Sequence, residues 1–159
     1  MNNQQQLNLI DTFYRAFQNK DYQTMAECYH QNATFEDPAF KLSGKHIGAM
    51  WHMLLARSTD LTINYSVQEQ DGKIIAHWEP VYTFSQTGRP VHNIIDATFE
   101  FKDGKIITHR DHFDFWRWSR QALGPSGTLL GWSGFLKGKV QTMAGKSLQQ
   151  FIANHEQYR

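Results

Sequence analysis

The sequence predicts an α+β domain in which helices pack on one face of an antiparallel sheet. Up to residue 60, apolar residues recur at three- and four-residue steps, which is typical of amphipathic helices. From residue 61 to residue 116, apolar and polar residues alternate, which is typical of strands. Asp71–Gly72 and Asp103–Gly104 stand between the alternating runs and are strong signals for tight turns.

The first part of the chain is predicted to be mainly helical. Ile10, Phe13 and Phe17 share one apolar face of the first expected helix. Pro38 should end the regular structure before it, because a proline restricts the backbone of the preceding residue. Ser43 is a candidate cap for the third helix. We expect helices at residues 4–19, 22–29 and 44–57, and a strand at residues 33–37.

The second part of the chain is predicted to be a meander of long strands followed by a helical extension. We expect strands at residues 61–70, 73–85, 91–102 and 105–116, a packed loop at 123–134 and a final helix at 135–155. Strands joined by such short turns must be antiparallel neighbours. The apolar stripe of the final helix needs a surface, which is the outer face of the sheet, the mouth of a cavity or a second subunit.

Composition narrows the possible partners. The net charge is +1 and the basic residues are scattered, so we expect no nucleic-acid partner. Cys28 is the single cysteine and is expected to be a half-buried structural thiol. No apolar run is long enough to span a bilayer, and no secretory leader begins the chain, so we expect a cytoplasmic protein with no membrane partner. No phosphate-binding glycine motif or redox ligand set is present, so no cofactor is expected.

Two motifs give the chain a resemblance to a known superfamily. These are ATFEDP at residues 33–38 and FEFKDGKIITHRDHFD at residues 99–114. With the predicted order of elements, they resemble the nuclear transport factor 2-like superfamily, which includes SnoaL-like polyketide cyclases, ketosteroid isomerases and limonene-epoxide hydrolases. The resemblance implies a cone-shaped, curved sheet around an apolar pocket, and a homodimer. It makes residues 1–118 the SnoaL-like domain and residues 119–159 an extension that packs on this domain or on a dimer partner.

The resemblance to the isomerases implies that Asp37 is a general base. A carboxylate at a strand end that faces an apolar pocket can have a raised pKa. The competing interpretation is that Asp37 only initiates a turn and bonds nearby backbone amides. The isomerase oxyanion hole uses a tyrosine and a protonated aspartic acid. Phe13 and Ala97 fall at those positions, with Tyr14 and Asp96 one residue away, so steroid isomerisation by that mechanism is not expected.

The resemblance to the epoxide hydrolases points to other residues. In those enzymes an Asp-Arg-Asp set activates water, and the matching positions here are His77 and Glu79 on one strand and Asp111 on the last strand. His77 and Glu79 are two residues apart and therefore share a face of the strand. Histidine replaces arginine and glutamate replaces aspartate, so the reaction itself is not carried over. Two other roles are open for these three residues: they form a hydrogen-bonded polar cluster inside the cone, or they orient a bound ligand without reacting with it.

The segment HRDHFDFWRW at residues 109–118 divides into two faces if it is a strand. One face carries Ile107, His109, Asp111, Phe113 and Phe115. The resemblance to the epoxide hydrolases implies that this is the inner face, where His109 and Asp111 form a candidate acid–base pair. Arg110 and His112 fall on the outer face. His109 and His112 therefore cannot bind the same ion, and no metal site is expected.

The candidate site is completed by aromatic residues. Aromatic residues make up 14% of the chain, which favours bulky rings in the core and around a cavity. The candidate catalytic residues are Asp37, Asp111, His109, His77, Glu79 and Tyr14. The candidate ligand-binding residues are Phe13, Phe35, Trp51, Phe99 and Phe113.

Three functions remain open at this point. The first is a small cofactor-independent enzyme, an isomerase, cyclase or epoxide hydrolase, that acts by acid–base chemistry on a small, largely apolar molecule. The second is a non-catalytic protein that binds a hydrophobic ligand in the same pocket. The third is a dimeric interaction module, which predicts a filled cavity and a large apolar surface on residues 123–152. The enzyme hypothesis predicts that the catalytic candidates line one pocket.

Overall fold

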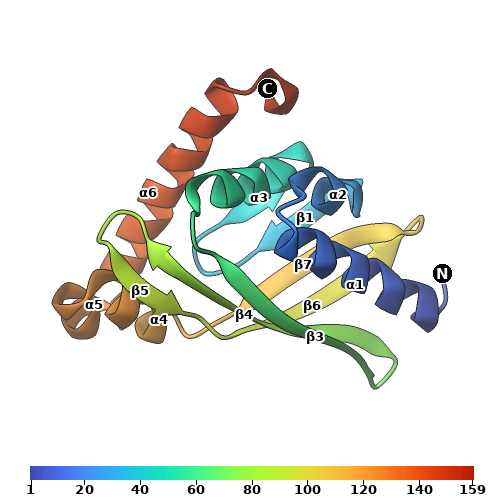
Figure 1. Cartoon of the computed structure of the whole chain (residues 1–159), viewed down its shortest axis with the longest axis horizontal. Coiled ribbons are helices and arrows are strands. Elements are labelled where there is room, and N and C mark those ends of the chain that lie inside the picture. Colours follow the sequence, from blue (N-terminus) through green and yellow to red (C-terminus); the bar gives the residue numbers. More distant parts are fainter.

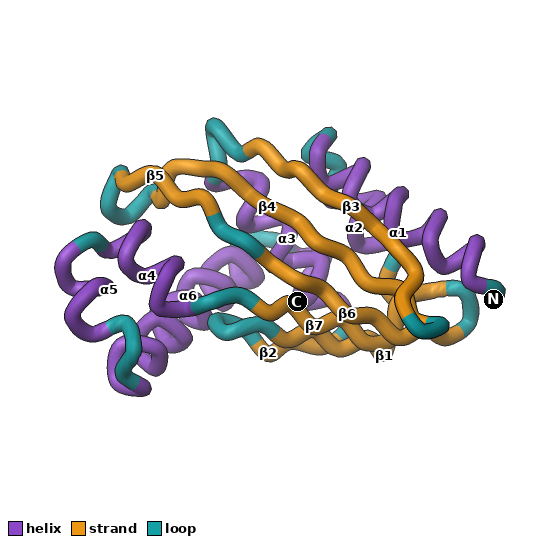
Figure 2. Tube along the Cα trace, turned by 90° about the horizontal axis from the view of Figure 1, so that it is seen from below, coloured by secondary structure: helices purple, strands orange, loops and turns teal.

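The computed structural model describes all residues, 1–159, and shows a curved sheet that does not close, with six α-helices around it (Figures 1 and 2). The helices are α1 (Asn3–Gln18), α2 (Tyr22–Glu27), α3 (Lys45–Arg57), α4 (Phe115–Leu123), α5 (Pro125–Leu130) and α6 (Gly134–Ala153), followed by a 3-10 turn at Glu156–Tyr158. The strands are β1 (Tyr29–Glu36), β2 (Lys41–Ser43), β3 (Thr62–Gln70), β4 (Lys73–Phe84), β5 (Arg89–His92), β6 (Ile95–Lys102) and β7 (Lys105–His112). The predicted α+β class is confirmed.

The sheet has one parallel pair among antiparallel neighbours. Its strand order is β2-β1-β7-β6-β4-β3, with β5 paired to β4. Only β1 and β7 run parallel. Asp71 and Asp103 adopt positive φ and are each followed by a glycine with positive φ, which is the backbone of the tight hairpin turns that the sequence predicts. The meander of antiparallel neighbours is therefore confirmed.

Helices α1, α2 and α3 cover one face of the sheet (Figure 1). Helix α1 begins with a capping box, in which Asn2 and Gln5 bond each other's backbone amides. Its apolar stripe is buried against the sheet, and Phe13 and Tyr14 have no exposed surface. The core between the layers is one large cluster of buried apolar residues, rich in aromatic rings. The covered face of the sheet is therefore the interior of the molecule.

Helices α4, α5 and α6 lie at one end of the sheet, and α6 runs back past α3 (Figures 1 and 2). Only Leu148 and Phe151 of α6 are buried, and both lie in its C-terminal part. None of the helices has the length and apolar character needed to cross a bilayer. The N-terminal part of α6 has no buried residue, and its Val140 packs at the edge of a smaller cluster formed by Val91, Trp118 and Ala122.

Several predicted boundaries are wrong. The strand expected at 105–116 ends at His112, because Asp114 caps α4 by accepting a hydrogen bond from the Arg117 amide at 3.1 Å. The strand expected at 91–102 is divided into β5 and β6. Ser43 is not a helix cap, since it ends β2, and the cap position before α3 is taken by Gly44 with φ +58°. The loop expected at 123–134 contains helix α5.

Candidate active site

The parallel pairing of β1 with β7 defines the centre of the candidate site. Phe35 lies opposite His109 and Glu36 lies opposite Arg110 in the register of the two strands. The next residues along, Asp37 and Asp111, are therefore brought to the same end of this strand pair. Alternation along a strand also places both carboxylates on the covered face of the sheet.

A chain of hydrogen bonds runs through the interior at this point. Trp51 donates its indole N–H to the Tyr29 hydroxyl at 3.1 Å, and that hydroxyl lies 2.7 Å from His109 Nδ1. His109 Nε2 lies 2.9 Å from Asp111 Oδ1, which also accepts the Trp78 indole N–H at 3.4 Å. A neutral imidazole protonated at Nε2 gives every group of the chain a partner, because Tyr29 then donates to Nδ1 and His109 donates to Asp111. We call these five residues the buried chain.

The buried chain fixes one carboxylate oxygen of Asp111 and leaves the other without a partner. His109 has no exposed side-chain surface and Asp111 has 2%. Both hydrogen bonds to Asp111 reach Oδ1, and none reaches Oδ2. A carboxylate held in this way is oriented by its histidine while one oxygen stays available for a proton.

Tyr14 lies beside the buried chain with an unused hydroxyl. Its oxygen is fully buried and has no hydrogen-bond partner. Burial raises the pKa of Tyr14 well above its usual value, and the charge of Asp111 adds to the effect. A neutral hydroxyl without a partner is a ready hydrogen-bond donor for an oxygen atom brought next to it.

Asp37 has the features of both roles predicted for it, the turn residue and the carboxyl group with a raised pKa. Its Oδ1 accepts the backbone amides of Ala39 and Phe40, both at 2.7 Å, as an aspartate in a turn does. The pKa of Asp37 is raised from 3.8 to about 7, first by burial and then by the charge of Asp111, while the two amide bonds oppose the shift. Asp37 is thus a turn residue whose carboxyl group also titrates near neutral pH.

Four of the five predicted ligand-binding aromatics surround His109. Their ring centroids lie 5.8 Å (Phe13), 5.0 Å (Phe35), 6.2 Å (Trp51) and 4.6 Å (Phe99) from that of the imidazole. Phe113 is partly buried and packs at the junction between the main core and a smaller cluster near α4. The aromatic rings therefore enclose the buried chain.

His77 and Glu79 do not join this group, so the inward placement expected for them is wrong. On β4 the inward positions belong to Ala76, Trp78 and Pro80, and the side chains of His77 and Glu79 are 41% and 33% exposed on the opposite face. His77 lies 2.9 Å from Asp96 and 2.8 Å from Glu79, and its pKa is raised by these two bonds.

The misplacement of His77 and Glu79 has a simple cause. The two residues share a face, as their spacing requires, but Trp78 between them fills the interior and donates to Asp111. The alternation of side chains along a strand therefore shows that His77 and Glu79 share a face, but not which face is buried. Trp78, the larger apolar residue between them, takes the buried face. His92 also reaches Glu79, at 2.7 Å, so an outer polar network replaces the expected inner one.

The inner face of β7 is also shifted by one residue near its start. Ile106 lies opposite Phe101 and Thr108 lies opposite Glu100, so Ile107 is an extra residue in the ladder. Ile106, rather than the expected Ile107, is therefore fully buried. His109 and Asp111 keep their expected inward positions.

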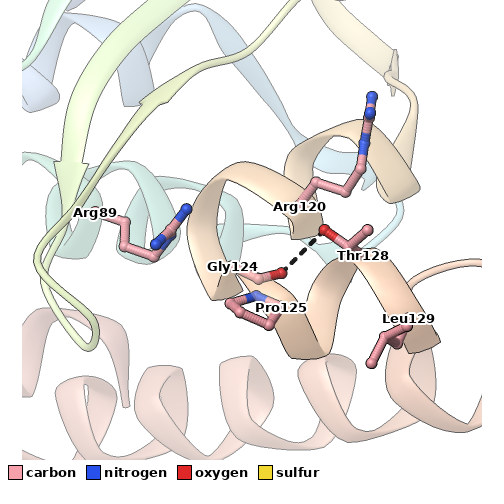
Figure 3. Close-up of a pocket in the computed structure, with 6 residues that line it drawn as sticks. All are labelled: Arg89, Arg120, Gly124, Pro125, Thr128 and Leu129. Atoms are coloured by element: carbon pink, nitrogen blue, oxygen red, sulfur yellow. Dashed lines mark hydrogen bonds between the residues drawn. The ribbon is translucent and has the colours of Figure 1, made fainter.

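Two pockets lie outside the buried chain. The first, of about 490 Å³, is lined by residues of α4, α5 and the start of β5 (Figure 3): Arg89, Arg120, Gly124, Pro125, Thr128 and Leu129. The second, of about 310 Å³, lies between α6, the start of α3 and the segment after Asp37, with Ala39, Phe40 and Gln141 among its residues. The conical pocket around Asp111 stays a prediction.

Two members of the buried chain, Tyr29 and Trp78, were not predicted as site residues. Tyr29 and Trp78 lie on β1 and β4, and Trp51 was predicted only as a ligand contact. The parallel pairing of β1 with β7 brings Tyr29 to His109, and local sequence patterns carry no sign of that pairing.

The structure brings together no group of three histidine, cysteine, aspartate or glutamate side chains that could hold a metal ion.

Comparison with known proteins gives the site a context. A family model described as the SnoaL-like domain matches residues 10–109. A structure provisionally named a polyketide cyclase, from Xanthomonas campestris pv. campestris, is similar with a TM-score of 0.64 at 19% identity, over 76% of this chain and 98% of that one. No curated protein matches the chain.

Two further structures are similar to the chain. The first is an LEH-like epoxide hydrolase from M. tuberculosis, with a TM-score of 0.59 at 18% identity, over 82% of this chain and 98% of that one. The second, from Catenulispora acidiphila, has a ketosteroid isomerase-like fold and was solved in complex with trimethylamine. Its TM-score is 0.63 at 10% identity, over 74% of this chain and 94% of that one. At these identities the likeness concerns the fold.

Proposed function

Because the chain belongs to the SnoaL-like domain family, we propose that it is a small enzyme that uses acid–base chemistry, without a cofactor, on a small and largely apolar organic molecule. The family match and the similar structures confirm the resemblance to the nuclear transport factor 2-like superfamily. Isomerisation, cyclisation and epoxide hydrolysis are the candidate reactions. Structures named for a cyclase and for a hydrolase are among those with this fold.

The observation that carries the proposal is the carboxyl pair at the end of the parallel strands. Asp111 is held by His109 and keeps one oxygen free, while Asp37 has a pKa raised to about 7. A carboxyl group that titrates near neutral pH can give or take a proton, and a second carboxyl group with a free oxygen beside it can take the complementary role. We assign Asp111 as the general base, His109 as the residue that positions it, and Asp37 as the group that exchanges a proton with the substrate.

Tyr14 supplies the third element of the proposed chemistry. Its hydroxyl is fully buried without a hydrogen bond, and it lies close enough to Asp111 for their charges to interact. We propose that it donates to the oxygen on which negative charge develops in the transition state. Ala97 lies opposite Asp111 and is buried, so that position offers no donor.

The substrate needs a route to this enclosed group, and we place its entrance at the segment after Asp37. Ala39 and Phe40 are part of the second pocket, whose far side is α6. Gln141 of α6 donates to the Pro38 carbonyl at 3.0 Å, so the helix holds this segment in place. A movement of residues 37–40 would open the shortest way from a surface pocket to Asp37.

The test is turnover of compounds that represent each reaction class: an apolar epoxide, an enolisable cyclic ketone and an aromatic polyketide-like ester. We expect turnover in one class, with a loss of roughly a hundredfold or more in kcat for both Asp111→Asn and Asp37→Asn. Asp96→Asn is the matched control, because Asp96 is exposed on the other face of the sheet. Wild-type rates in Asp111→Asn would rule out the proposed base.

A second candidate function is favoured by how completely the group is enclosed. His109 and Tyr14 have no exposed surface, which suits a protein that binds an apolar ligand without reacting with it. That function predicts no turnover in any class. It also predicts that an apolar compound raises the melting temperature of the wild type and of Asp111→Asn by the same amount. Thermal unfolding with the same compounds therefore separates binding from catalysis.

A further inference from the structure

The junction of α5 and α6 exposes an unusual amount of apolar side chain. Within seven residues, Leu129 is 70% exposed, Leu130 44%, Trp132 76% and Phe135 68%. Trp132, Leu129 and Phe135 are the three most exposed large apolar residues of the chain. We call these four side chains the tail surface. Contiguous apolar exposure of this kind marks a surface that docks on something.

The segment of chain that carries the tail surface has charged side chains of a single sign. Residues 115–155 contain five basic residues and no aspartate or glutamate, although the whole chain has a net charge of only +1. The basic residues are Arg117, Arg120, Lys137, Lys139 and Lys146. None of the five forms an ion pair with a carboxylate. Their positive charge is therefore available to an external partner.

The basic side chains lie within the same region as the apolar ones. The Lys139 ammonium is 5.2 Å from the centroid of the Phe135 ring. Arg120 and Leu129 both line the pocket of about 490 Å³ at α4 and α5, together with Arg89 from β5 (Figure 3). The Arg120 guanidinium also lies 4.2 Å from the ring of Trp116. At least two of the five cations, Arg120 and Lys139, therefore lie directly beside exposed apolar side chains.

We propose that the tail surface docks the protein on an anionic lipid bilayer. Tryptophan, phenylalanine and leucine are the side chains that enter the boundary between headgroups and acyl chains, and nearby lysine and arginine are attracted to anionic headgroups. Arg89 and Arg120, which line the pocket beside Leu129, add two positive charges to this end of the molecule. This mode of binding departs from the expectation of no membrane partner, and it needs no spanning helix but only a helix junction that lies in the interface.

The tail surface of a second protein molecule is a less suitable partner than an anionic bilayer. Two tail surfaces brought face to face would set five unpaired cations against five others, and like charges in contact disfavour association. A bilayer that contains acidic lipids supplies both an apolar layer and the opposite charge. The charge pattern therefore selects the bilayer over a symmetric contact between copies.

Vesicle binding of the full chain tests the proposal. We use phosphatidylcholine vesicles with and without roughly 30% phosphatidylserine, at about 0.05 and about 0.5 M NaCl. The protein should sediment with the anionic vesicles at least about tenfold more strongly than with the neutral ones, and high salt should weaken the binding. Trp132→Ser/Phe135→Ser and, separately, Lys137→Glu/Lys139→Glu should each weaken it by roughly tenfold or more.

Matched controls separate docking from general effects. Val81→Ser removes an apolar side chain that is 40% exposed on β4, and Lys73→Glu/Lys102→Glu reverses two exposed lysines at the other end of the sheet. Both should bind the vesicles like the wild type. Circular dichroism and thermal unfolding show whether each variant is folded. If Trp132→Ser/Phe135→Ser unfolds, the comparison of Lys137→Glu/Lys139→Glu with Lys73→Glu/Lys102→Glu still tests the proposal.

Three outcomes would overturn the proposal. The first is that the wild type binds neither kind of vesicle. The second is that the tail variants and the controls bind equally well. The third is that light scattering finds a wild-type dimer that Trp132→Ser/Phe135→Ser converts to a monomer, with no vesicle binding, in which case the tail surface docks on a second copy.

Discussion

Asp37 shows how one side chain can serve the backbone and the chemistry together. Its Oδ1 is used by two amides of its own turn, while its Oδ2 makes no hydrogen bond. The turn fixes the position of the carboxyl group, and burial raises its pKa to about 7. A residue whose conformation is already fixed by the fold loses little freedom when it acts on a substrate.

The raised pKa of Asp37 predicts a change of stability with pH. The folded protein holds this proton up to about pH 7, and the unfolded chain releases it near pH 4, so the contribution of Asp37 to stability falls as the pH rises between these values. The loss amounts to up to about 4 kcal/mol. Asp37→Asn keeps the Oδ1 acceptor and should remove this slope, as measured by urea unfolding from pH 4.5 to 8. Asp96→Asn should retain the wild-type slope, and parallel curves for Asp37→Asn and the wild type would contradict the shift.

Tyr14 and Tyr29 form a matched pair for a second prediction. The Tyr14 hydroxyl has no partner, so Tyr14→Phe should raise the free energy of unfolding by about 1 kcal/mol. The Tyr29 hydroxyl bonds both His109 and Trp51, so Tyr29→Phe should lower it by about 1–3 kcal/mol. Urea unfolding measures both. A stabilised Tyr14→Phe that has also lost activity would support its role as a donor, and a destabilised one would show that the hydroxyl has a structural role.

At the scale of elements, local patterns predict most of the secondary structure and miss the pairing that makes the site. The turns at Asp71 and Asp103 are visible in the sequence because they need left-handed backbone, and the antiparallel meander follows from them. The parallel contact of β1 with β7 joins segments that no tight turn connects, so no turn residues in the sequence indicate it. Only the resemblance of the two motifs to a known superfamily pointed to both Asp37 and Asp111.

The contact between α4 and α5 gives a prediction at the same scale. A Cβ on Gly127 would overlap the backbone carbonyl of Ser119, whereas a Cβ on Gly138 in α6 meets nothing within 4 Å. Gly127→Ala should therefore cost about 1–3 kcal/mol in the free energy of unfolding. Gly138→Ala should stabilise α6 by roughly 0.5–1 kcal/mol. Thermal unfolding compares the two, and equal melting temperatures would show that α5 does not pack against α4 in solution.

At the scale of the whole molecule, the face of the sheet opposite the helices carries exposed strand residues and an ionic network. Glu79 accepts bonds from His77 and His92, and Val81 and Ile94 are 40% and 39% exposed. The homodimer expected from the resemblance stays a prediction, and this face is the surface that we propose for it. Light scattering at micromolar concentration should give twice the mass of the chain.

A charge placed on that face tests the dimer separately from the tail surface. Val81→Asp should give a monomer, because burying an unpaired carboxylate in the contact is costly. Trp132→Ser/Phe135→Ser should leave the dimer intact. A wild-type monomer under these conditions would refute the prediction.

The parallel pairing of β1 and β7 also affects how the chain folds. Residues 37–104 lie between the two strands, so their contact closes a long loop of chain. Contacts between residues far apart in the sequence cost the most loop-closure entropy and slow folding. The helices and the meander can form from neighbouring residues, whereas Asp37 and Asp111 meet only when this loop closes. During synthesis, the carboxyl pair is therefore absent until β7 has emerged and returned to β1.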